Sequence, residues 1–162
     1  MRNAIRFTAL IFSVITLSVL LAHLLELPGK MKLSQQEYMV VQSIYSGWAF
    51  LGIPEIGAII LVGMWLYRER QTRKRFRFLL YALILFVISL LIFFVFTFPT
   101  NLQTRNWTYM SGDWQSLRDR WEYSHAVRAI LNLAGFSFLI VTLLVRRRTG
   151  GGYSKTYNKT NQ

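Results

Sequence analysis

Long apolar runs alternate with short polar connections along the chain. The runs are residues 5 to 27, 44 to 67, 78 to 98 and 121 to 145. Each reaches about the 20 residues that a helix needs to cross a hydrocarbon core of about 30 Å. The pattern predicts an all-α fold, a four-transmembrane-helix bundle formed by residues 1 to 148. The remaining residues, 149 to 162, are rich in glycine and in polar and basic side chains, so we expect a disordered cytoplasmic tail there.

Two of the polar connections carry helix start signals. Ser34 and Glu37 have the spacing of a capping box, and Ser116 with Asp119 repeats the pattern with an aspartate. We therefore expect the helices of the second and fourth apolar runs to begin ahead of those runs.

The composition fits a membrane protein. The 162 residues are 53% hydrophobic and their mean hydropathy is +0.32, whereas a soluble domain carries more polar surface. The net charge of +12 lies in blocks between the apolar runs, and a nucleic-acid binder needs its basic residues along one accessible face. The partner predicted by this pattern is the lipid bilayer, with no nucleic acid.

The absence of cysteine narrows the chemistry. With no cysteine in the chain, disulfides, thiolate metal sites, iron-sulfur clusters and dithiol redox reactions are excluded. Any redox chemistry must use other side chains.

The basic residues predict the orientation of the bundle. Of the 19 Lys and Arg residues, two lie in the N-terminal segment, six in residues 68 to 77 and five in the tail from Arg146. Cytoplasmic loops carry an excess of Lys and Arg. We therefore expect an integral, multi-pass protein with both termini in the cytoplasm, in the cytoplasmic membrane if the host is bacterial.

Ionisable side chains gather at the outer ends of the predicted spans. His23 and Glu26 lie three residues apart near the end of the first span, and Glu122 and His125 have the same spacing in the fourth. This spacing places each pair on one helical face. These are the only two histidines of the chain. Because ionisable residues inside a membrane are costly and face the bundle interior, both pairs are predicted to share one site.

Several chemistries fit the two pairs. Imidazole and carboxylate groups on facing helices are the ligands of bundle metal sites, so His23, Glu26, Glu122 and His125 are candidate ligands of a transition metal such as iron. The two histidines are also candidate axial ligands of a haem. A third interpretation needs no cofactor and makes a histidine a general base held by a carboxylate. A fourth is purely structural, an interhelical network that fixes packing.

Four segments carry a resemblance to a known family. They are HLLELPGK at 23 to 30, YMVVQSIYSGW at 38 to 48, NLQTRNW at 101 to 107 and LRDRWEYSHAVR at 117 to 128. Together they resemble the small four-span membrane family named after the anthrone oxygenases. The resemblance implies oxidation, by molecular oxygen, of an electron-rich polycyclic phenol such as an anthrone to a quinone.

These observations lead to one main hypothesis and one alternative. The main hypothesis is an integral membrane oxidoreductase that acts on a lipophilic aromatic, anthrone-like or quinone-like compound near the outer leaflet. Its catalytic residues are His23, Glu26, Glu122 and His125, and its substrate-binding residues are Tyr45, Trp48, Glu55, Asn101, Trp107, Trp121 and Arg128. The alternative is a non-catalytic membrane protein, a small-molecule binder or an accessory subunit, whose His/Glu cluster only holds the helices together. Transport is less favoured, because the third span offers almost no polar lining.

Overall fold

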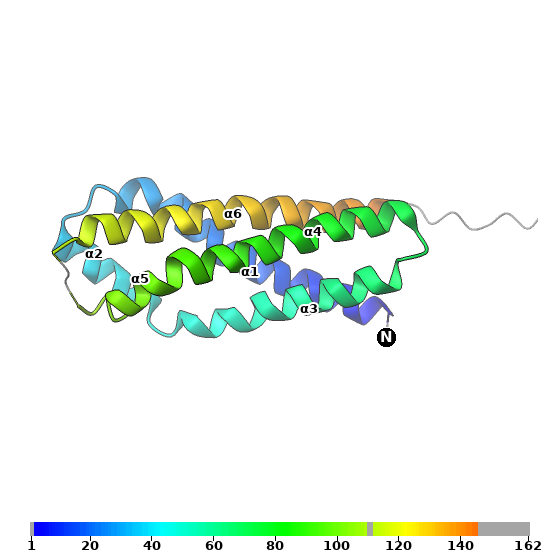
Figure 1. The fold of residues 1–162 in the computed structure, drawn as a ribbon, viewed down its shortest axis with the longest axis horizontal. Helices are drawn as coiled ribbons and strands as arrows, with labels where there is room; N and C mark the ends of the chain where they lie inside the picture. Colours follow the sequence, from blue (N-terminus) through cyan, green and yellow to red (C-terminus); the bar gives the residue numbers. More distant parts are fainter. Residues whose placement is uncertain (1, 110–111, 146–162) are drawn as a thin grey trace, which may run out of the picture.

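A computed structural model describes residues 2 to 109 and 112 to 145 of the chain. Four long helices run side by side, with short helices at one end (Figure 1). The elements in chain order are α1 (Arg2–Lys30), α2 (Gln35–Gln42), the 3-10 turns η1 (Ser43–Tyr45) and η2 (Trp48–Leu51), α3 (Gly52–Arg68), α4 (Arg73–Ile92), the π-helical turn η3 (Phe93–Thr97), α5 (Phe98–Gln103) and α6 (Trp114–Leu144). No strand occurs in these residues.

The four long helices form a closed ring of neighbours. Helix α1 packs against α3 and α6, and α4 packs against the same two helices. Successive long helices are antiparallel, as in an up-down-up-down bundle. Four helical segments are long and apolar enough to cross a membrane, namely Asn3–Lys30, Trp48–Arg68, Arg73–Gln103 and Trp114–Leu144. The predicted all-α, four-span fold is confirmed.

The helix starts differ in part from those predicted. The capping box at Ser34 is present, with Glu37 bonding back to the cap residue, but it opens the separate helix α2. The chain then turns at Gly47, whose φ of 85° favours glycine, and the second span begins after it. The cap predicted at Ser116 is wrong, because α6 already begins at Trp114.

Helix α1 is longer than its apolar run suggested. It continues through Pro28 and ends at Lys30, so Glu26 and Lys30 lie one turn apart on the same face. This extension places the Lys30 amine next to the Glu26 carboxylate.

The two ends of the bundle differ in composition. We call the end with the N-terminus, the α3–α4 turn and the last turn of α6 the basic end, and the end with α2 and α5 the aromatic end (Figure 1). An apolar cluster near the basic end includes Trp65, Leu79 and Leu139. A second cluster at the aromatic end contains Tyr38, Trp107, Leu117 and Trp121. The predicted tail, residues 149 to 162, lies outside the described residues.

Candidate functional site

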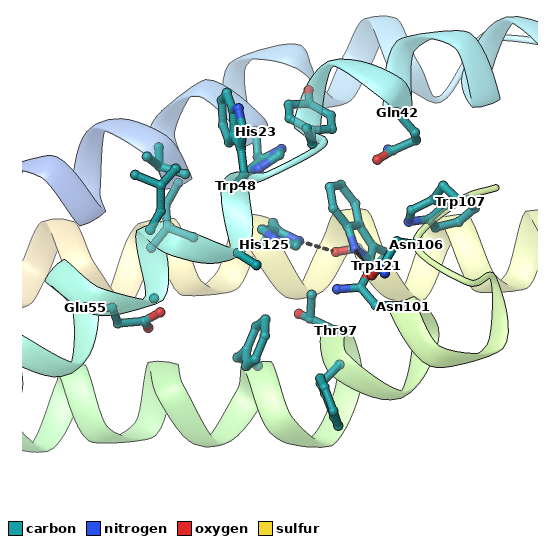
Figure 2. A pocket seen from close by; sticks show the side chains of 18 of the residues that line it. His23, Gln42, Trp48, Glu55, Thr97, Asn101, Asn106, Trp107, Trp121 and His125 are labelled. Carbon is teal, nitrogen blue, oxygen red and sulfur yellow. Dashed lines mark hydrogen bonds between the residues drawn. The ribbon is translucent and has the colours of Figure 1, made fainter.

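A cavity of about 790 Å³ lies toward the aromatic end of the bundle. Its size is within the range of about 300–1,000 Å³ that is usual for small-molecule sites. All four long helices contribute to its wall, together with η1, η2, η3 and α5 (Figure 2). Both histidines line it, and so do all seven residues predicted to bind substrate: Tyr45, Trp48, Glu55, Asn101, Trp107, Trp121 and Arg128.

The two histidines meet inside this cavity. His23 of α1 and His125 of α6 are both buried, and their ring centroids are 4.4 Å apart. The Trp121 ring lies 4.0 Å from His125 and 5.0 Å from His23, centroid to centroid. Tyr45 and Trp48 close the other side of His23, at 4.6 and 5.7 Å. Aromatic rings of the cavity lining therefore pack around both imidazoles.

Hydrogen bonds assign different roles to the ring nitrogens. Nδ1 of His125 lies 2.9 Å from the backbone carbonyl of Trp121. A carbonyl can only accept, so this nitrogen carries a proton and the lone pair of a neutral His125 is on Nε2. Nδ1 of His23 lies 3.3 Å from the Lys30 amine. An ammonium group can only donate, so here Nδ1 is the acceptor.

The two predicted carboxylates lie behind the histidines, outside the cavity lining. Glu26 accepts a hydrogen bond from the Tyr45 hydroxyl and lies 2.9 Å from the Lys30 amine. Glu122 accepts from the Tyr38 hydroxyl at 2.8 Å and lies 3.5 Å from the same amine. In the part of the chain that the structure describes, no hydrogen bond joins either carboxylate to a histidine.

The hydroxyl of Tyr38 acts only as a donor in its hydrogen bond to Glu122. Tyr38 lies on α2, outside the four spans. Burial, and next the negative charge of Glu122, raise the pKa of its hydroxyl well above the usual value. The hydroxyl therefore stays protonated and keeps its hydrogen bond to the carboxylate at any ordinary pH.

A second polar group forms one wall of the cavity further along α6. One terminal nitrogen of Arg128 lies 2.8 Å from each carboxylate oxygen of Glu55. The guanidinium also lies over the Phe93 ring, 5.0 Å from its centroid. His125 and Arg128 are three residues apart, so this ion pair sits about one helical turn from the histidines.

The π-helical turn brings α5 against α6. Thr97 and Ser124 share a hydrogen bond of 2.7 Å. Asn101 accepts a hydrogen bond of 2.8 Å from the indole nitrogen of Trp121. This bond holds the Trp121 ring against both imidazoles, as the close view shows (Figure 2). π-helical turns are frequent at functional sites.

The predicted metal and haem sites can be compared with this geometry. Within residues 2 to 109 and 112 to 145, no group of three or more His, Asp or Glu side chains could hold a metal ion. The ammonium of Lys30 sits between Glu26 and Glu122 and would repel a cation. A bis-histidine haem needs its porphyrin between the two imidazoles, and these rings touch. The residues present do not fit a resident metal or haem, and metal binding by the two His/Glu pairs is not shown.

The sequence of the chain matches a known protein family. Residues 42 to 138 match the family model described as anthrone oxygenase. The chain belongs to the anthrone oxygenase family. No curated protein and no solved structure matches the chain significantly.

The segment that matches the anthrone oxygenase family forms the whole cavity lining except the part that α1 contributes. It includes Glu122 and His125 of α6 and all seven aromatic and polar residues predicted to bind substrate. Helix α1, with His23, Glu26 and Lys30, precedes it. The histidine pair thus joins a residue of the matched segment to one from outside it.

Three side chains of this anthrone oxygenase site were missed by the sequence analysis. Lys30, Tyr38 and Gln42 are buried and surround Glu122. The signal for Lys30 was its spacing of seven residues from His23 and four from Glu26, which places all three on one helical face. The first predicted span ends at residue 27, ahead of Lys30. Gln42 and Tyr38 lie on the separate helix α2, whose packing onto α6 no pattern in the sequence indicates.

Proposed function

We propose that this member of the anthrone oxygenase family oxidises a flat, lipophilic phenol such as an anthrone with molecular oxygen, using its own side chains and no metal. The observation that carries the proposal is His125. Its Nδ1 donates to a backbone carbonyl, which leaves Nε2 as a base in a ring that lines an apolar cavity.

The reaction assigned to this base begins with proton removal. Nε2 of His125 takes a proton from the methylene carbon of the anthrone, and the carbanion forms a carbon–oxygen bond with O₂ to give a peroxide. The same carbon then loses its second proton, the oxygen–oxygen bond breaks and a carbonyl forms. The balance is one anthrone and one O₂ consumed, with one quinone and one water released. O₂ is the only oxidant that the reaction requires.

The cavity wall supports a lipophilic substrate that arrives from the bilayer. Ile56 of α3 and Phe94, Phe98 and Leu102 of the η3–α5 segment line the cavity and are also exposed on the bundle surface. In a membrane, apolar side chains on that surface face lipid. A flat aromatic compound dissolved in the hydrocarbon layer therefore has an apolar route between α3 and the η3–α5 segment.

The charge distribution supports one orientation. Arg6 near the start of α1, Arg70 in the α3–α4 turn and Arg75 near the start of α4 lie at the basic end, and the cavity lies toward the aromatic end. By the positive-inside rule, the basic end and both termini face the cytoplasm, and the cavity lies in the outer leaflet.

The proposal is tested by turnover of an anthrone in lipid nanodiscs. We expect formation of the quinone with one O₂ consumed per product and ¹⁸O from ¹⁸O₂ in the new carbonyl, above the spontaneous oxidation measured with heat-inactivated protein. His125→Ala should lower kcat by about 10²–10⁴-fold, the usual contribution of a positioned base. Tyr123→Ala, exposed on the same helix, is the matched control and should keep full activity. Unchanged turnover in His125→Ala would overturn the proposal.

The non-catalytic alternative is favoured by one observation. Lys30, Tyr38 and Tyr45 together engage both carboxylates, which is what a purely structural network requires. In that case His125→Ala lowers the thermal stability and no protein-dependent turnover is seen in the wild type.

A further inference from the structure

Lys30 is a buried cation at the centre of the polar network, only 3% exposed. We infer that Lys30 is a positioning residue that fixes His23 as a hydrogen-bond donor toward the cavity, so that the two histidines have opposite tautomers and separate tasks. The inference rests on the proposed function for its catalytic part, and on contacts alone for its structural part.

The three hydrogens of the Lys30 ammonium match three acceptors. They are Glu26 at 2.9 Å, Nδ1 of His23 at 3.3 Å and Glu122 at 3.5 Å. A buried charge is costly unless it is paired and hydrogen-bonded. An ammonium group has three donors and no acceptor, so it can only donate. A third stabilising contact comes from the Tyr45 ring, whose centroid lies 4.4 Å from the amine.

These contacts determine where the proton of His23 lies. A proton on Nδ1 would set two donors against each other 3.3 Å apart. His23 is therefore neutral, with Nδ1 as acceptor and its single proton on Nε2, at the other side of the ring. His125 has the reverse arrangement, because the Trp121 carbonyl holds its proton on Nδ1. Of the two imidazoles that line the cavity, one thus carries a proton on Nε2 and the other a lone pair there.

This difference suits the proposed first step. Removal of the methylene proton by His125 moves negative charge onto the carbonyl oxygen of the anthrone. A donor already in place for that oxygen stabilises the transition state more than the ground state. By occupying Nδ1, Lys30 holds His23 in the tautomer that supplies this donor.

The tautomers can be measured directly by ¹⁵N NMR of histidine-labelled protein. The chain has only two histidines, so the spectrum contains the signals of two imidazoles. The signals that remain in His23→Gln belong to His125. We expect one Nε2–H ring and one Nδ1–H ring in the wild type. In Lys30→Met the His23 signals should change while those of His125 stay, and kcat should fall by about 10²–10³-fold, as for loss of one oxyanion donor, with KM little changed. Lys30→Arg keeps a donor and should recover part of kcat.

The control is Lys32→Met, which removes an exposed lysine two residues away and should alter neither the spectrum nor kcat. Two histidines with the same tautomer in the wild type would overturn the inference, and this result needs no variant that folds. Unchanged His23 signals in Lys30→Met would also overturn it. Opposite tautomers in a protein without turnover would support the Lys30–His23 pairing and reject the proposed function instead.

Discussion

The bundle buries one carboxylate at each end, and the surroundings of the two differ. Glu69 at the basic end and Glu122 at the aromatic end are both 1% exposed. Glu69 pairs with Arg6 and, at 3.5 Å, with Arg75, beside an apolar cluster that includes Trp65. Glu122 pairs with a single lysine and with neutral donors, next to the wall of the cavity. Equally buried carboxylates thus lie beside an apolar cluster at one end and beside a cavity at the other.

The two buried carboxylates also differ in what lies next to their partners. At the basic end, guanidinium groups from α1 and α4 converge on one acid at the end of α3 and tie three helices together. At the aromatic end, the network stops at His23, which lines the cavity. A burial value alone does not distinguish the two cases, whereas the presence of a cavity beside the network does.

The largest expected effect is on stability at the basic end. Glu69→Gln leaves Arg6 and Arg75 without their shared negative charge, and breaking a buried pair in this way costs about 3–5 kcal/mol. Thermal unfolding in detergent should show this loss. Below the lowered Tm, kcat should equal that of the wild type, because the cavity is at the other end. A specific loss of kcat in the folded variant would mean that the two ends are coupled.

The fold could be predicted from the sequence because it depends on long patterns. Four apolar runs and the basic blocks between them indicated the helices, and the bundle follows from helix length and short connections. Local signals were less reliable. Ser34 caps a helix as predicted, while Ser116 lies inside one, because α6 extends beyond its apolar run.

The cavity lining was predictable and the network behind it was not. Aromatic and ionisable residues at the aromatic end of the bundle, such as Trp48 and His125, do line the cavity. The bonds of Tyr38 and Gln42 to Glu122 depend on how α2 packs onto α6, which no periodicity encodes. The spacing predicts that Glu26 pairs with His23. In the structure Glu26 pairs with Lys30 and accepts a hydrogen bond from Tyr45 instead, because an ammonium and a phenol are stronger donors than a neutral imidazole.

A smaller effect is expected from the neutral donor at the aromatic end. Tyr38→Phe removes the hydrogen bond of 2.8 Å to Glu122 but leaves the ring packed against Trp107. A hydrogen bond to a charged group contributes about 1.5–3 kcal/mol, and Gln42 and Lys30 remain as partners, so we expect the lower part of that range in thermal unfolding. If the network also positions His23, kcat should fall by less than it does in Lys30→Met. A greater loss of kcat in Tyr38→Phe would give Tyr38 the positioning task instead.

The smallest effect concerns the exposed start of α2, which supports Tyr38. Ser34 and Glu37 form a capping box, and hydrogen bonds from the Ser34 hydroxyl and backbone lower the pKa of Glu37 below its usual value. A carboxyl group whose pKa is lower in the folded than in the unfolded protein stabilises the fold at pH values above its unfolded-state pKa. This contribution is lost as the pH falls through the folded-state pKa. Ser34→Ala should cost about 1 kcal/mol, seen as faster amide exchange in α2, and should remove most of the acid dependence of that exchange. Exchange in α6 should not change, because the cap lies outside the buried network. If α6 responded as well, α2 and the network around Glu122 would unfold as one unit.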